Sequence, residues 1–175
     1  MWLTWANALT ALRLALIAPL VLAVIHGVWT VAAGLFTLAV LTDYFDGPLA
    51  RHHGQATPIG GFMDHATDAL FVTVLCAAMA LHHHLAWLLP VLIPLAFIQY
   101  SVDSRVLAGR ALRPNRLGRV NGISYYVLPG VVIGAHWLDW WGWLAMPTSI
   151  ASWLLCTSTL VSMGLRATNY RATAD

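Results

Sequence analysis

The sequence predicts an all-α membrane protein with six transmembrane helices. Of its 175 residues, 59% are hydrophobic and only 9% are charged, whereas a typical soluble domain carries roughly 25% charged residues. Its mean hydropathy is +0.72, and it contains nine tryptophans. A chain of this composition lacks the polar residues needed to cover a soluble surface. We therefore expect residues 1–175 to form one polytopic membrane domain.

The first three predicted helices span residues 6–25, 29–51 and 60–82. Each offers about the 20 residues that a helix needs to cross a bilayer core about 30 Å thick. His26-Gly27 separates the first two helices, and the stretch from His52 to Pro58 separates the second from the third.

The last three predicted helices span residues 85–105, 121–138 and 146–165. The run His82-His83-His84 precedes the fourth helix, and we interpret it as interfacial polar residues rather than as a metal site. Between the fifth and sixth helices lie Trp140, Trp141 and Trp143. Aromatic belts of this kind are expected at the edge of a bilayer.

The arginines determine the predicted orientation. No arginine lies in the turns near residues 26–29, 82–85 or 139–146, so this layout places the basic residues at or near the opposite side of the membrane. They are Arg13, Arg51, Arg105, Arg110, Arg113, Arg116, Arg119, Arg166 and Arg171. Because cytoplasmic loops are enriched in basic residues, we place both termini and the loops at 52–59 and 105–120 on the cytoplasmic side of the inner cell membrane.

Four of the seven acidic residues fall within residues 43–68: Asp43, Asp46, Asp64 and Asp68. Spacings of three and four residues put each pair on one face of its helix, and the short loop between the helices predicts that the two faces meet. Buried carboxylates are costly unless they are paired or bind a metal. Oxygen ligands of this kind favour Mg²⁺ or Mn²⁺, and four of them can bridge two ions.

The pattern around these aspartates resembles the signature of the CDP-alcohol phosphotransferase, or CDP-alcohol phosphatidyltransferase, family. It reads Asp43-x2-Asp46-Gly47-x2-Ala50-Arg51-x8-Gly60-x3-Asp64-x3-Asp68, and every signature position is matched. The resemblance implies six transmembrane helices, a homodimer and a divalent-metal site that opens to the cytosol. It also implies transfer of a phosphatidyl or similar group from a CDP-linked donor to an alcohol, with release of CMP.

The resemblance implies roles for individual residues. Asp43, Asp46 and Asp64 would bind the metal, and Asp68 would be the general base and a further ligand. Contacts to the CDP donor would come from Gly47, Ala50, Arg51, Thr57 and Gly60. Asn7, Thr10 and Arg13, spaced by three on one helix face, resemble the N-x2-T-x2-R entry of phosphatidylglycerophosphate synthases, which would help to bind the donor headgroup. The alternative for Arg13 is a snorkelling side chain at a helix start.

The favoured reaction joins CDP-diacylglycerol to glycerol 3-phosphate. Arg113, Arg116 and Arg119 suit a second phosphate, on the acceptor or on a lipid headgroup, although topology alone would also place arginines there. Leu117-Gly118-Arg119 only partly matches the L-G-K-x-K-T of glycerophosphate-using relatives.

Several alternatives therefore stay open. The acceptor can also be inositol phosphate, serine, another phospholipid or an amino alcohol. A divalent-cation transporter is the alternative from another class, disfavoured because the aspartates lie at helix ends beside Arg51. No nucleic-acid partner is expected, because the arginines form no soluble basic face.

Overall fold

The computed structural model describes the backbone of residues 5–52, 58–103 and 116–172, and the side chains of residues 9–44, 61–103 and 116–168. All regular structure in this part of the chain is helical. The six helices that it contains are α1 (Trp5–Ile25), α2 (Trp29–His52), α3 (Pro58–Leu81), α4 (Leu89–Asp103), α5 (Arg116–Trp137) and α6 (Trp141–Ala172). The predicted all-α class is therefore confirmed.

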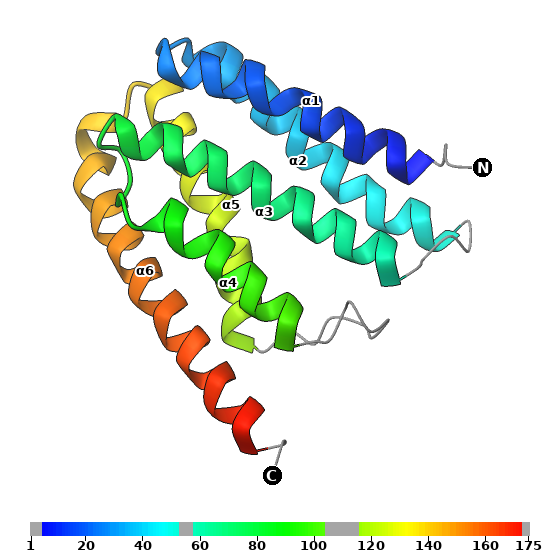
Figure 1. Ribbon diagram of the computed structural model, residues 1–175. Helices are drawn as coiled ribbons and strands as arrows, with labels where there is room; N and C mark the ends of the chain where they lie inside the picture. The colour runs from blue at the N-terminus through cyan, green and yellow to red at the C-terminus, as the bar shows by residue number, and fades with distance from the viewer. Residues whose placement is uncertain (1–4, 53–57, 104–115, 173–175) are drawn as a thin grey trace.

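The helices form a bundle whose three short turns lie together at one end (Figure 1). These turns, at residues 26–28, 82–88 and 138–140, join α1 to α2, α3 to α4 and α5 to α6. We call this the turn end. Helix α1 packs against α2 and α3, α5 packs against α2 and α3, and α6 packs against α4 and α5. Residues that follow or precede a turn by the same number of positions therefore lie at similar depths in the bundle.

Three helices differ from the sequence-based expectation by more than two residues at one or both ends. Helix α4 begins at Leu89 rather than at residue 85, because Pro90 fits a first helical turn, where its missing N–H loses no hydrogen bond. Helix α5 begins at Arg116 rather than at residue 121, since its polar first turn is invisible to a hydropathy criterion. Helix α6 runs from Trp141 to Ala172 rather than over 146–165, with Pro147 inside it.

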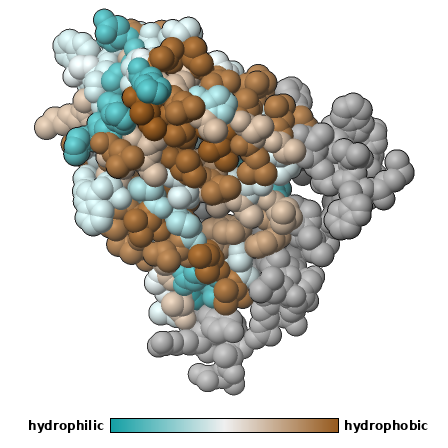
Figure 2. All heavy atoms as spheres, turned by 45° about the horizontal axis from the view of Figure 1, so that its top comes forward, coloured by the Kyte–Doolittle hydropathy of each residue, from teal (hydrophilic) through white to brown (hydrophobic). Residues whose placement is uncertain are grey.

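Two helical segments meet a length-and-composition test for membrane spans, Gly61–Leu81 and Trp141–Thr168. Shorter apolar stretches occur in α1, α2 and α4, at Leu9–Ile25, Trp29–Tyr44 and Leu89–Asp103. Each of the six helices exposes large apolar side chains, including Leu14, Val31, Leu70, Ile98, Val127 and Leu154. Hydrophobic residues cover much of the face in Figure 2. Contiguous apolar surface of this kind marks contact with a membrane or another protein.

Small residues and interhelical hydrogen bonds hold the helices close together. A Cβ at Gly130 of α5 would lie 3.0 Å from the Phe36 ring of α2, closer than most Cβ contacts, so glycine allows this approach without a shift of the ring. Other hydrogen bonds join α4 to α6, α5 to α6, and the turn at residues 82–88 to α6. These bonds run from Gln99 Nε2 to the Met163 carbonyl (2.9 Å), from Ser158 Oγ to Asn121 Oδ1 (2.7 Å) and from the Ala86 N–H to Ser152 Oγ (3.0 Å).

Four aromatic rings pack together at the turn end. His136 stacks between Trp29 and Trp141, with ring centroids 4.0 and 4.4 Å apart. His84 meets His136 and Trp141 edge-on at 4.7 and 4.9 Å. His82 and His83 are exposed, whereas His84 is half-buried. The interfacial interpretation of the histidine run therefore fits the first two histidines, while His84 belongs to a packed cluster that ties α2, α5 and α6 to the turn before α4.

Candidate active site

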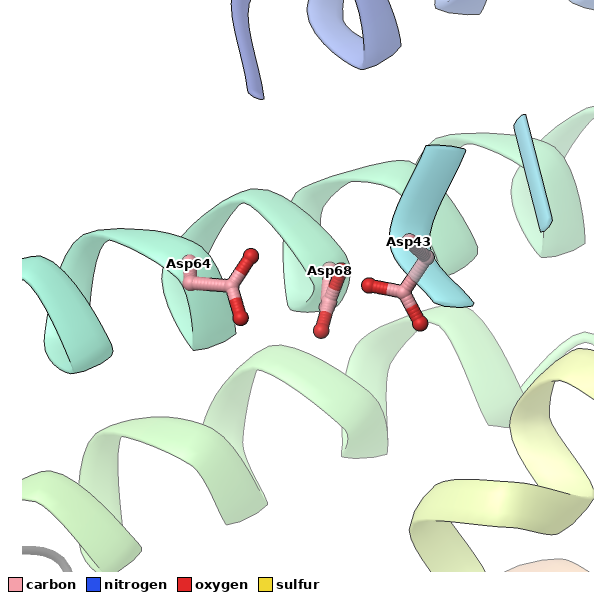
Figure 3. A group of neighbouring side chains, drawn as sticks. All are labelled: Asp43, Asp64 and Asp68. Atoms are coloured by element: carbon pink, nitrogen blue, oxygen red, sulfur yellow. The ribbon is translucent and has the colours of Figure 1, made fainter. Parts of the chain in front are cut away.

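Three predicted aspartates converge in the half of the bundle that lies away from the turns. One oxygen from each of Asp43, Asp64 and Asp68 lies within 4.8 Å of the others. Asp64 and Asp68 lie one turn apart on the same face of α3, and Asp43 approaches from α2 (Figure 3). We call this region the aspartate end. The predicted convergence of carboxylates from these two helices is thus present in the described part of the site.

Helix α1 contributes a cation to the centre of this cluster. The Arg13 side chain is 0% exposed, and its guanidinium lies 2.7 Å from Oδ1 of Asp43, 3.2 Å from Oδ1 of Asp64 and 2.5 Å from Oδ1 of Asp68. Carboxylates so close together repel strongly in a low dielectric, and the guanidinium offsets that repulsion. Arg13 therefore does not snorkel to the membrane surface. Because α1 packs against both α2 and α3, it also links the two helices that carry the aspartates.

Helix α5 adds a hydroxyl that sequence reasoning missed. The Tyr126 hydroxyl donates a hydrogen bond to Oδ1 of Asp68 at 2.9 Å. Its ring stacks on Phe71 of α3, with centroids 5.7 Å apart and an interplanar angle of 16°. In the sequence, Tyr126 is an unremarkable aromatic residue in an apolar segment, so no local pattern identifies it.

A cavity of about 510 Å³ opens beside the aspartates. Its lining includes Asp43, Asp68 and Tyr126 together with the predicted acceptor residue Arg119. It also includes Arg166 of α6, which sequence reasoning assigned only to topology. The Cζ atom of Arg166 lies 4.7 Å from the ring centroid of Tyr100, a cation–π contact. The same cavity is thus lined by carboxylates and by two guanidinium groups.

The structure locates the other predicted residues less closely. Thr10 is half-buried, three residues before Arg13 on α1. Arg116 is exposed in the first turn of α5 and is absent from the described lining of the cavity. Six residues lie in helices, but their side chains are outside the described part: Asn7 in α1, Asp46, Gly47, Ala50 and Arg51 in α2, and Gly60 in α3. Thr57 and Arg113 lie outside the described residues altogether.

The donor set fits a hard divalent cation. It consists of carboxylate oxygens on two helices, which is the chemistry that Mg²⁺ and Mn²⁺ prefer. With all four groups ionised, the three aspartates and Arg13 together carry a formal charge of −2. This excess of negative charge equals the charge of one divalent ion, so Arg13 does not cancel the attraction for a metal.

Comparisons with known proteins agree with this chemistry. A family profile described as CDP-alcohol phosphatidyltransferase matches residues 3–160. A probable phosphatidylglycerophosphate synthase of Mycobacterium tuberculosis is 31% identical over 137 residues, which cover 71% of this chain and 66% of that protein. A CDP-diacylglycerol–glycerol-3-phosphate 3-phosphatidyltransferase of Yersinia enterocolitica is 40% identical over 88 residues, covering 49% of this chain and 47% of that protein. The matches thus span between about half and just under two thirds of these relatives.

Proposed function

The chain belongs to the CDP-alcohol phosphatidyltransferase family, and we propose that it transfers a phosphatidyl group from CDP-diacylglycerol to glycerol 3-phosphate. The products are phosphatidylglycerophosphate and CMP. One observation carries the choice of acceptor: Asp68, Arg119 and Arg166 line one cavity. A phosphorylated alcohol matches this lining, because its hydroxyl needs a base and its phosphate needs cations. The names of the two relatives, which refer to phosphatidylglycerophosphate and to glycerol 3-phosphate, support the same acceptor.

The aspartates hold the metal in this proposal. Asp43, Asp64 and Asp68, with Asp46 as a fourth ligand, bind two Mg²⁺ or Mn²⁺ ions. Bound ions of this kind neutralise a diphosphate and polarise the phosphorus under attack. Arg13 keeps the carboxylates together from the side of α1, through its contacts of 2.5–3.2 Å.

Asp68 is the base. It accepts the proton of the acceptor hydroxyl while that oxygen forms a bond to the phosphatidyl phosphorus. The bond from this phosphorus to the oxygen shared with CMP breaks, and CMP leaves with the electron pair. Because a carboxylate beside a metal is a modest base, most of the acceleration comes from positioning and charge neutralisation.

The remaining predicted residues complete the substrate sites. The donor is bound by residues at the start of α1 and around the connection from α2 to α3: Asn7, Thr10, Gly47, Ala50, Arg51, Thr57 and Gly60. The acceptor phosphate is bound by Arg119, with Arg113 and Arg116 from the same basic segment. Arg166 joins this set, because it lines the same cavity as Arg119.

The lipid substrate requires a membrane setting. We place the single domain of residues 1–175 in the inner cell membrane, with all six helices crossing it and the aspartate end facing the cytoplasm. Apolar side chains exposed on all six helices support contact with lipid, and the bias of the arginines supports the orientation. A homodimer, as implied by the family resemblance, is part of the same proposal.

An acceptor panel tests the function. Purified protein is incubated with CDP-diacylglycerol, Mg²⁺ or Mn²⁺, and one alcohol at a time, and both CMP and the lipid product are measured by mass spectrometry. We expect phosphatidylglycerophosphate with glycerol 3-phosphate, and no product in excess EDTA. CMP release with serine or inositol phosphate but not with glycerol 3-phosphate would overturn the acceptor. No CMP release with any alcohol would overturn the reaction class.

A further inference from the structure

We infer that Tyr126 is a positioning residue: its hydroxyl fixes the rotation of the Asp68 carboxylate, on which both metal binding and proton acceptance depend. The inference rests on the proposed function of Asp68. Sequence reasoning gave Tyr126 no role, and the role follows from a hydrogen bond, a ring stack and a close approach of helices.

The first observation is that two donors bind the same oxygen. Oδ1 of Asp68 accepts a hydrogen bond from Tyr126 of α5 at 2.9 Å and one from Arg13 of α1 at 2.5 Å. A carboxylate turns about its bond to the Cβ atom over a broad range of angles. Two donors on one oxygen restrict this rotation and thereby set the direction in which Oδ2 points. Among the described contacts of Asp68, the hydrogen bond from Tyr126 is the one that comes from α5.

The second observation is that the Tyr126 ring is itself held in place. It stacks on Phe71, which is 1% exposed, and Phe71 in turn packs against Phe36 with ring centroids 6.4 Å apart. Phe36 can enter because residue 130, one turn after Tyr126, is a glycine whose Cβ position lies 3.0 Å from the Phe36 ring. Three rings from α2, α3 and α5 thus aim one hydroxyl at Asp68.

The hydroxyl of Tyr126 affects the metal site through the Asp68 carboxylate, which it orients. Groups that hydrogen-bond to metal ligands orient them, and their loss typically lowers metal affinity or activity about 10–100-fold. Replacing Tyr126 by phenylalanine keeps the ring stack and removes only the donor. We therefore expect the Tyr126→Phe protein to fold normally, while Oδ1 of Asp68 loses its hydrogen bond from α5 and keeps the one from Arg13.

The test measures metal binding and turnover separately, on the full chain. Mn²⁺ is titrated by electron paramagnetic resonance without substrate, and kcat and both KM values are then measured with CDP-diacylglycerol and glycerol 3-phosphate. For Tyr126→Phe we expect the Mn²⁺ Kd to rise about tenfold and kcat to fall about tenfold, with both KM values within about twofold of the wild type.

The matched control is Ser152→Ala at the turn end. It also removes a buried hydroxyl, one that accepts from the Ala86 N–H at 3.0 Å and donates to the Ser149 carbonyl at 2.7 Å. A structural effect alone would act in both variants, whereas positioning acts only in Tyr126→Phe. The inference is overturned if Tyr126→Phe keeps the Mn²⁺ Kd within twofold, if Ser152→Ala weakens Mn²⁺ equally, or if the wild type binds no Mn²⁺. A wild type that binds Mn²⁺ but makes no lipid overturns the proposed function instead, and the metal titration still decides the role of Tyr126.

Discussion

The two ends of the bundle both hold titratable side chains that are at least half-buried, but the charge on these side chains differs between the ends. At the aspartate end, the guanidinium of Arg13 lies within 3.2 Å of three carboxyl groups, so its buried charge is kept and paired. At the turn end, His84 packs against the rings of Trp141 and His136, and burial lowers its pKa to about 4. Its ring is therefore neutral near pH 7.

This difference separates function from packing in an apolar chain. Arginine cannot shed its proton in a protein, so burying it requires partners, and those partners form a site for ionic ligands. Histidine can shed its proton and then packs as an aromatic ring. The aspartate cluster and the histidine run both appear in the sequence as short groups of titratable residues, but only the first forms a site for ionic ligands. Substitutions that keep shape and change charge should be severe at the aspartate end and mild at the turn end.

Asp68→Asn should give the largest effect. The amide keeps the shape of the side chain but cannot accept the proton, and it is a poorer metal ligand. We expect turnover to fall at least about 1000-fold, within the range seen when a general base is lost, while CDP-diacylglycerol still binds. Product formation and donor binding are measured on the same preparation.

The control for this substitution is the same change at the turn end. Asp139 is exposed and has a φ of 60°, a conformation that asparagine also tolerates. Asp139→Asn should therefore keep near-normal turnover. Near-normal turnover in Asp68→Asn would show that the base is wrongly assigned.

Arg13→Met should give the next largest effect, on stability. Removing one partner of a buried ion pair typically costs about 3–5 kcal/mol, and here three carboxylates lose their shared partner. We expect a lower melting temperature by intrinsic tryptophan fluorescence, and Mn²⁺ should raise the melting temperature of this variant more than that of the wild type. Arg13→Lys keeps the charge but not the planar, forked guanidinium, so its melting temperature should lie between those of Arg13→Met and the wild type. An unchanged melting temperature in Arg13→Met would mean that the pairing contributes nothing.

The sequence predicted the fold class and the shared helix face of Asp64 and Asp68 because both depend on local patterns. Hydropathy marks apolar helices, and spacings of three and four residues put Asp64 and Asp68 on one face whatever the tertiary structure is. The start of α5 at Arg116 was missed, since a polar first turn does not register as apolar. Membrane placement of all six helices stays a prediction.

The partners of the aspartates could not be predicted in the same way. Arg13 is 51 and 55 residues from Asp64 and Asp68, and Tyr126 is 58 residues from Asp68. Which side chain meets which at such separations depends on how α1, α3 and α5 pack. The packing in turn depends on features such as the glycine at residue 130, whose purpose is evident only beside Phe36. Arg166 was missed for the same reason, because its place in the cavity depends on how α6 lies against α4 and α5.

Arg166→Gln tests whether the arginines that line the cavity bind the phosphate of the acceptor. A charge-assisted hydrogen bond contributes about 1.5–3 kcal/mol, so we expect the KM for glycerol 3-phosphate to rise about tenfold or more. The KM for CDP-diacylglycerol should stay within about twofold, since we propose that other segments of the chain bind the donor. Arg119→Gln should act in the same direction. Equal increases in both KM values would point to loss of packing against Tyr100 rather than to acceptor binding.

The smallest effect is expected from pH acting at the turn end. Burial, with smaller contributions from His136, His82 and His83, lowers the pKa of His84 from 6.5 to about 4. The unfolded chain therefore takes up a proton between pH 6.5 and 4 that the folded chain refuses, so stability is complete above this window and falls as the pH drops through it. Solvent screens part of this penalty because the ring is only half-buried. We expect the melting temperature to fall by about 2–4 °C, the shift caused by about 1 kcal/mol in a domain of this size.

Two variants test whether His84 causes this fall. His84→Gln should flatten the plot of melting temperature against pH between pH 6.5 and 4, whereas His26→Gln, at an exposed position in another turn of the same end, should leave it unchanged. A profile that is equally steep in all three proteins would show that His84 does not carry the effect and that the turn end is no different from an ordinary polar surface.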